Sequence, residues 1–441
     1  MEIELRNVGI LEKANVILDG MTVITGFNDS GKSTVGKALY GLYHGMNFYQ
    51  DSIERDRASY LFAPFRNKLN PETAANEEME MNYHRDRMRL RMLIESYLGN
   101  GVGSAGILED LSQLKSKIEI ILKNLDCQRS DIEILMDDFE NRLHEVLQPS
   151  FLLKVKKNVV RQTFAEEFSG EYLNLFHDDE AYIAISDDVN KYKVILSNKD
   201  MSGIEKNIAV SLNFDDVILI DTPMLLNYML ENSGFIGYIN SYNHQQELIR
   251  KIINVSEKLK SKNIVENSII TERIGGLNAS ISKIEETLKV DLVIKNNDIF
   301  YEIKGKKVGI SSLASGLKTY AIIKLLIDNG YLNSRSLLII DEPEVHLHPE
   351  WQMNIAEILV LLQKEIGIRI MLSTHSPYFL QAIDVYSRKY GIDANTHFYL
   401  ANRSEYGAIL NSIDGNLEAT YKMLAKPFIT LRDMDNEMSM V

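Results

Sequence analysis

The sequence predicts an α/β fold, a mixed sheet with helical insertions, and three apolar runs are the main evidence for it. Residues 21–25, 337–340 and 368–371 are continuously apolar or nearly so, which is typical of strands that are buried on both faces of a parallel sheet. A polar segment follows each run. Ligands bind at the carboxyl ends of the strands in such sheets, so we expect these three segments to form one site.

Residues 26–34 read GFNDSGKST, fit the pattern G-x-x-x-x-G-K-[ST], and lie between the first apolar run and a predicted helix. This order suits a phosphate-binding loop, because backbone N–H groups and the helix N-terminus then surround an anion. We expect Lys32 to reach the β- and γ-phosphates of ATP and the Ser33 hydroxyl to bind Mg²⁺. A chance glycine turn is the weaker interpretation. The predicted nucleotide-binding residues of the loop are Asn28, Ser30, Gly31, Lys32, Ser33 and Thr34.

The composition is that of an ordinary globular chain of 441 residues, with 45% hydrophobic and 25% charged residues. A formal charge of −14 argues against binding of nucleic acid through the net charge of the protein, so any such contact needs a local basic patch. Residues 84–91 carry four arginines and are the best candidate, although a solvated helix face explains them more simply. Cys127 is the one cysteine and excludes an internal disulfide. No apolar run approaches about 18 residues, so we expect a cytoplasmic protein without a membrane partner.

Short alternating segments predict additional strands on both sides of the phosphate-binding loop in the sequence. Residues 3–8 and 14–18 predict a hairpin before the loop, and residues 181–185 and 192–196 predict a second one after it. Residues 294–308 alternate again and are expected to bring the chain back into the sheet.

Two helical stretches lie between the hairpins. Apolar residues from 107 to 125 are spaced by four and three, and a second apolar face runs from 132 to 146. We interpret them as a short antiparallel coiled-coil hairpin inserted into the fold; two helices of the main core are the alternative. The predicted segments are an N-terminal lobe (1–50), a helical insertion (51–160), a continuation of the sheet (161–224), a helical lid (225–290) and a C-terminal lobe (291–441).

The second of the three apolar runs ends in an Asp-Glu pair. We expect Asp341 to hold Mg²⁺ through its water shell and Glu342 to orient or deprotonate the attacking water. A similar run ends at Asp221, but Thr-Pro follows where the catalytic acid should stand, so we interpret that strand as structural.

The third run leads into residues 372–377, LSTHSP. A histidine at this edge of the sheet can hydrogen-bond the γ-phosphate or the water, so His375 is predicted to act in catalysis. A lone histidine is more often structural, but this position favours function. A metal site of His346, His348 and His375 is a minor alternative, because no Cys or further His lies at ligand spacing.

Together, these motifs resemble the ABC-type ATPase heads of the SMC, RecF and OLD-like group. The run DEPEVHLHP, which begins at Asp341, and the run LSTHSP are especially similar to those of OLD-like ATPases in bacterial anti-phage systems, including the ATPase subunits of Septu-type defence. The resemblance covers the ATPase parts of the chain and says little about the insertions.

The resemblance implies a role for residues 311–318, SSLASGLK, which by themselves are only a Ser/Gly-rich helix start. They match the ABC signature, with an alanine in place of its first serine. Such heads pair head to tail, so Ser315, Gly316 and Lys318 would contact the nucleotide that Lys32 of another protomer holds. The D-loop would fall on residues 344–348. A homo-oligomer is therefore expected.

The chain also departs from this group. OLD nucleases carry a Toprim domain after the ATPase, and the 66 residues after His375 leave no room for one, so we expect nuclease chemistry in a separate polypeptide. The heptad stretch is too short for an SMC-like arm, and no Q-loop glutamine can be assigned. Our first hypothesis is an ATP-hydrolysing switch that controls assembly or a partner nuclease in anti-phage defence. A RecF-like DNA-repair ATPase and the nucleotide-binding subunit of a membrane transporter are the alternatives.

Overall fold

The chain divides into two compact units, one formed by residues 1–44 and 160–441 and the other by residues 45–159. We call them the sheet unit and the helical unit, and each is described by itself. The computed structural model describes residues 1–47, 57–66, 77–99, 107–124, 128–176, 179–186, 191–197, 214–222, 225, 243–253, 291–295, 298–303, 306–309, 315–328 and 330–439.

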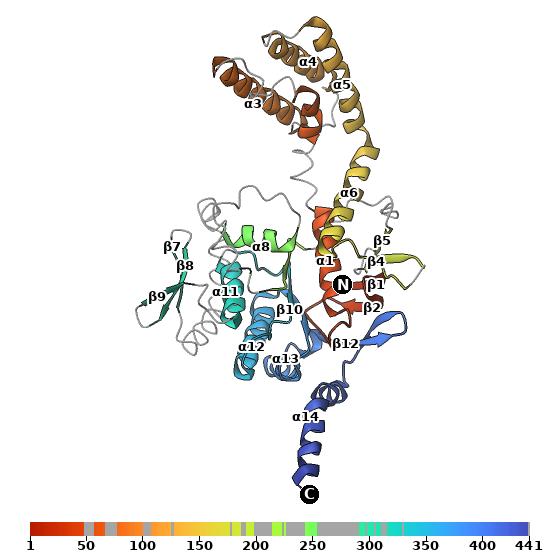
Figure 1. Ribbon diagram of the computed structural model, residues 1–441, viewed down its shortest axis with the longest axis vertical. Coiled ribbons are helices and arrows are strands. Elements are labelled where there is room, and N and C mark those ends of the chain that lie inside the picture. The colour runs from red at the N-terminus through yellow and green to blue at the C-terminus, as the bar shows by residue number, and fades with distance from the viewer. Residues whose placement is uncertain are drawn as a thin grey trace. The chain divides into compact units, whose positions relative to one another are not determined.

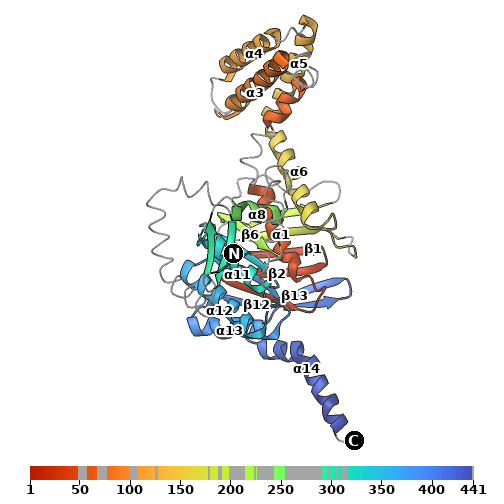
Figure 2. The same cartoon turned by 60° about the vertical axis from the view of Figure 1, so that its left-hand side comes forward.

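The sheet unit contains a ten-stranded mixed sheet in the order β5-β4-β1-β2-β13-β12-β3-β11-β10-β6 (Figure 1). Strands β12, β3, β11, β10 and β6 are parallel to one another. On the other side, β13 pairs in parallel with β2, and the remaining pairs are antiparallel. Figure 2 shows the β1–β2 hairpin beside the β12–β13 hairpin. The strands are β1 (Glu2–Val8), β2 (Leu11–Ile17), β3 (Met21–Gly26), β4 (Ala181–Ser186), β5 (Lys191–Leu196), β6 (Asp216–Ile220), β10 (Ser336–Asp341), β11 (Arg369–Thr374), β12 (Thr396–Ser404) and β13 (Gly407–Ser412).

These findings confirm the predicted α/β fold class with a mixed sheet. Both predicted hairpins are present, as the antiparallel pairs β1–β2 and β4–β5. The three apolar runs form β3, β10 and β11, and every residue of β3 is buried.

Local sequence signals set the ends of the helices next to the sheet. Helix α12 has a proline in its first turn and ends at Gly367, which adopts a left-handed conformation with φ 74°. In α13 the Ser376 hydroxyl caps the N-terminus by accepting a hydrogen bond from the Phe379 N–H at 3.2 Å. The helices of this unit are α1 (Lys32–Asn47), α8 (His244–Ile253), α11 (Ser315–Asp328), α12 (Pro349–Ile366), α13 (Pro377–Tyr390) and α14 (Leu417–Ser439), and α6 (Pro149–Glu167) begins in the helical unit and ends in this one.

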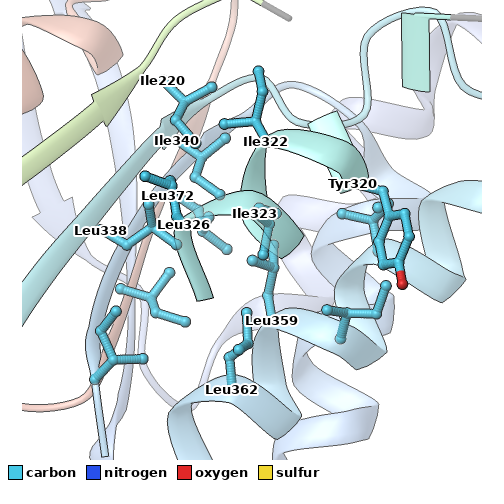
Figure 3. Close-up of a cluster of buried hydrophobic side chains, with 14 of the residues drawn as sticks. Ile220, Tyr320, Ile322, Ile323, Leu326, Leu338, Ile340, Leu359, Leu362 and Leu372 are labelled. Carbon is cyan, nitrogen blue, oxygen red and sulfur yellow. The ribbon is translucent and has the colours of Figure 1, made fainter. Parts of the chain in front are cut away.

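A hydrophobic core lies between the parallel strands and helices α11 and α12 (Figure 3). Ile323 and Leu326 of α11 lie close to Leu338 of β10 and Leu359 of α12, and all four side chains are fully buried. Burying one such side chain contributes about 1.5–3 kcal/mol, so this core holds β10 in place for the polar residues at its end.

The helical unit has a separate core. The expected pair of helices is present as α4 (Ile107–Asn124) and α5 (Arg129–Leu147), and helix α3 (Glu77–Gly99) and the segment 57–66 complete the core. Leu90, Ile94 and Leu98 are spaced by four on α3 and form one buried face, which is why this charged helix also packs. The predicted pair of helices is therefore part of a small helical bundle.

A second sheet contains strands β7 (Asp291–Lys295), β8 (Asp298–Ile303) and β9 (Lys306–Gly309) in antiparallel order. Residues 294–308 were expected to bring the chain back into sheet, and the described residues of this range lie in the strands of this separate sheet. Most of the predicted helical lid, 225–290, lies outside the described residues. Within the residues that the structure describes, no helix is long and apolar enough to cross a membrane.

Candidate functional site

The phosphate-binding loop connects β3 to α1, as the sequence predicts. Gly31 has φ 80°, a conformation that side chains rarely adopt, and a Cβ atom there would approach Leu11 to 2.7 Å. Gly36 lets α1 pack closely on β10, because a Cβ atom there would approach Ile339 to 2.8 Å. The two glycines therefore fix the turn of the loop and the distance between α1 and β10.

Lys32 lies within this loop and is only 5% exposed. Its Nζ donates a hydrogen bond to the Phe27 carbonyl at 2.8 Å, and the Ser30 hydroxyl donates to the same oxygen at 2.6 Å. Nζ also lies 3.9 Å from Oε1 of Glu342. A phosphate in the loop would compete with the Phe27 carbonyl for this ammonium group.

Parallel register brings the ends of β3, β11 and β10 to one edge of the sheet. Thr374 lies opposite Thr25, and Asp341 lies opposite Ser373. Asp341 accepts hydrogen bonds from the hydroxyls of Ser33 and Ser373. Burial raises the pKa of Asp341, so a cation beside it would be stabilising. Mg²⁺ prefers oxygen ligands, and the hydroxyl of Ser33 and the carboxylate of Asp341 fit it.

Glu342 follows directly and has φ 47°, a left-handed conformation that turns the chain away from β10. Its N–H donates to the Ser373 carbonyl at 3.0 Å. Its carboxylate oxygen Oε1 lies 3.1 Å from Nδ1 of His375. The structure thus brings Lys32, Asp341, Glu342 and His375 together from three strand ends.

Residues 1–380 of the chain match the family model described as the AAA ATPase domain. The chain belongs to this family. The ATPase is also similar to a structure of an SMC head bound to the C-terminal winged-helix domain of ScpA, with 12% identity, 93% and 96% of the two chains covered, and a TM-score of 0.41. It is also similar to the SMC head domain from Thermotoga maritima, with 8% identity, 93% of this chain and 97% of the other chain covered, and a TM-score of 0.38. At such identities and TM-scores, the similarity assigns no partner or assembly to this chain.

Asp221 of the ATPase, at the end of the strand that the sequence predicts to be structural, lies at the same edge of the sheet. Strand β6 pairs with β10, with Ile220 opposite Ile340, so Asp221 is next to Asp341 in the sheet. Its carboxylate lies 2.9 Å from Nε2 of His244 and accepts from the Gln245 amide at 3.2 Å.

His244 lies between two carboxylates. Its Nδ1 is 2.6 Å from Oε2 of Glu167, whose Oε1 accepts from the backbone N–H of His244 at 2.9 Å. Burial opposes protonation of this ring, but hydrogen bonds with Asp221 and Glu167 raise its pKa to about 9. Burial also opposes ionisation of Asp221, but the contact with His244 holds the pKa of that carboxyl below its usual value. The raised pKa favours the protonated ring, which can pair with both carboxylates.

The structure places the predicted signature residues Ser315, Gly316 and Lys318 in the first turn of α11. Lys318 is 2% exposed, and burial lowers its pKa. Contact with a nucleotide on another protomer would require this side chain to move outward. Asn28 and Thr34 lie in the loop and at the start of α1, and the Asn28 carbonyl accepts a hydrogen bond from Arg403 at 3.2 Å.

The other predicted groups are dispersed. Within the described part of the chain, no group of three His, Cys, Asp or Glu side chains could hold a metal ion. His348 caps α12, and His346 has φ 66° in the turn before it. The four arginines of α3 are exposed, and the side chains of Arg85 and Arg91 lie near Asp86 and Glu95.

Proposed function

We propose that the chain is an Mg²⁺-dependent ATPase switch whose nucleotide state controls assembly or a partner nuclease in bacterial anti-phage defence. The observation that supports hydrolysis is that the side chains of five residues meet at one edge of the sheet. Lys32 would bind the phosphates, Ser33 and Asp341 would hold Mg²⁺, and Glu342 would act on the water. His375, 3.1 Å from Glu342, would orient it and sense the γ-phosphate.

The proposed mechanism starts from the contacts of Lys32 and Glu342. Their side chains lie 3.9 Å apart, so the ammonium group is within reach of both the loop and the base. Phosphate binding would draw Lys32 toward the nucleotide and away from Glu342. Glu342 would then keep its contact with His375. Mg²⁺, when bound, neutralises charge on the phosphates, and the carboxylate of Glu342 is then placed to accept the proton of the water.

Head-to-tail pairing is the second part of the proposal, and it follows from the sequence resemblance of residues 311–318. Ser315 lies at the N-terminus of α11, where N–H groups favour an anion, so it would complete the nucleotide site of a partner subunit.

A complementation experiment tests this pairing. Lys32→Ala and Ser315→Arg should each stop hydrolysis, while an equal mixture should recover about a quarter of the wild-type rate, because half of the randomly formed dimers contain one intact composite site. Lys32→Ala mixed with Lys32→Arg is the matched control and should stay inactive. A mixture of Lys32→Ala and Ser315→Arg that also stays inactive, although the subunits exchange, would contradict the pairing.

The defence role needs a cellular test. Bacteria that carry the gene with its neighbours should lose resistance to phage when Glu342→Gln replaces the wild type, and the partner nuclease should copurify with the wild-type chain. Equal plaque counts for cells with and without the intact genes would contradict this role.

A DNA-repair ATPase remains the alternative, and the exposure of four arginines on α3 favours it. Replacing Arg85, Arg87, Arg89 and Arg91 by glutamine should then abolish DNA binding that weakens with salt. Under the defence proposal, these substitutions leave ATP hydrolysis unchanged.

A further inference from the structure

Two turns meet at the edge of the sheet, one after β10 (residues 342–347) and one that starts at the last residue of β11 (residues 374–376). The buried carboxylate of Glu344 joins them. Its Oε1 accepts hydrogen bonds from the Thr374 hydroxyl, from the His375 N–H at 3.1 Å and from the Ser376 N–H at 3.3 Å. One oxygen atom of the first turn thus binds three consecutive residues of the second.

This contact fixes the backbone of His375 and therefore the position from which its imidazole side chain extends. The His375 side chain is 44% exposed, so its surroundings hold it only in part. Nδ1 lies 3.1 Å from Oε1 of Glu342 and 3.8 Å from Oε1 of Glu344. Because Glu344 holds the backbone N–H of His375, the ring loses less conformational entropy when it contacts Glu342.

Gln352 of α12 provides a second link between the same turns. Its amide donates to the Leu347 carbonyl at 3.1 Å, and its carbonyl oxygen accepts from the Ser376 hydroxyl at 2.6 Å. The two turns are therefore already joined by a neutral group, and a buried charge is not needed only to hold them together.

Glu344 is also costly for the fold. It is 3% exposed, and burial raises its pKa. Its second oxygen, Oε2, is buried and has no hydrogen-bond partner among the described residues. If Glu344 only linked the two turns, a neutral side chain or one with all its hydrogen bonds made would be more stable there. A buried acceptor without a hydrogen bond costs about 1–3 kcal/mol.

We propose that Glu344 is a positioning residue for ATP hydrolysis, which sets His375 against Glu342 and leaves nucleotide binding unchanged. The inference rests on the proposed roles of Glu342 and His375. Glu344 accepts a hydrogen bond from the backbone N–H of His375, and its Oε1 lies 3.8 Å from the Nδ1 of that ring. The groups that would bind ATP and Mg²⁺, Lys32 and Ser33, instead contact the Phe27 carbonyl, Glu342 and Asp341. The effect should therefore fall on kcat.

The test compares Glu344→Ala with Glu344→Gln and with Glu350→Gln, an exposed glutamate in the first turn of α12. Glu344→Ala should lower kcat by about tenfold or more, with ATP affinity within about threefold of the wild type. Glu344→Gln keeps a carbonyl oxygen for the same three donors and should recover much of the rate. Glu350→Gln should behave as the wild type. Fluorescence of Trp351, the one tryptophan, checks that each variant is folded.

A double-variant cycle separates positioning from a general structural role. Adding Glu344→Ala to His375→Ala should cause little further loss of kcat, because Glu344 acts through His375. If the two losses multiply, or if Glu344→Ala keeps kcat within about twofold of the wild type, the inference is wrong. If Glu344→Ala does not fold, Thr374→Val replaces it, since it removes one of the three donors and should lower kcat without weakening ATP binding.

The proposed catalytic roles are tested separately by Glu342→Gln and His375→Ala. Normal turnover by Glu342→Gln would overturn the proposed base. If Glu342→Gln does not hydrolyse ATP, and the kcat losses of Glu344→Ala and His375→Ala multiply, only the proposed role of Glu344 is wrong.

Discussion

Replacing His244 by glutamine tests whether this buried ring is a cation. Glutamine cannot take up a proton, although its amide can still donate a hydrogen bond to one of the carboxylates. Glu167 and Asp221 face the two ring nitrogens, and the ring of Tyr40 lies at its edge with centroids 5.8 Å apart. The substitution therefore removes the positive charge and leaves two acids, of which Glu167 is fully buried and Asp221 is partly buried.

The pKa of His244 sets the expected magnitude. A rise from 6.5 to about 9 corresponds, at about 1.4 kcal/mol per pH unit, to about 3 kcal/mol of stability. The side chain is 6% exposed, so solvent screens this contribution little. Since the folded-state pKa is raised, the contribution is complete below pH 6.5 and is lost as the pH rises through 9.

Urea unfolding followed by Trp351 fluorescence measures this contribution, because Trp351 lies in α12 of the sheet unit. The difference in unfolding free energy between wild type and His244→Gln should be largest near pH 6 and should shrink by about 3 kcal/mol by pH 10. Groups whose pKa is the same in both proteins cancel in this difference. A difference that is the same at pH 6 and pH 10 would show that His244 is neutral in the folded protein and would refute the reasoning.

Three further predictions concern the nucleotide site and the helical unit. Lys32→Ala should weaken binding of a fluorescent ATP analogue by about 100-fold or more, because the loop loses its buried cation; unchanged binding would contradict the role of the loop. Glu342→Gln should bind ATP as the wild type does and turn over about 100-fold or more slowly in a phosphate-release assay. Phe139→Ala should destabilise the helical unit by about 3–5 kcal/mol, seen as faster hydrogen exchange in α4 and α5, since Phe139 is fully buried. The exposed Ile134→Ala is its control and should change exchange little.

The sequence predicts the central strands well because their signals are local. A continuous apolar run needs burial on both faces, and the three runs indeed form the neighbouring strands β3, β11 and β10. The contact between Ser33 and Asp341 follows from that arrangement, since parallel strand ends share one edge of the sheet.

Long-range partners explain what the sequence analysis missed. Glu167 and His244 are separated by 77 residues, and no spacing rule connects them. The sequence predicts a structural strand before Asp221, but the neighbour of that strand, β10, is known only from the structure. Glu344 was visible only as a D-loop residue, because its three donors lie about 30 residues later in the sequence, at and just after the end of β11.

The extent of each core was also difficult to predict. Helix α3 was interpreted as a solvated charged face, yet three of its apolar residues, four apart, complete the helical unit. Residues 294–308 show the alternation of a strand, but alternation does not say which sheet a strand joins. They form part of the separate sheet β7-β8-β9.

The position of β3 in the sheet has a consequence for biosynthesis. Its two neighbours are β11 and β12, which begin at Arg369 and Thr396. The partners of this apolar strand are therefore synthesised more than 340 residues after it, and both of its edges lack their native partners until then. Unpaired strand edges invite association with other chains, so the nascent protein should depend on chaperones until its last third has been made.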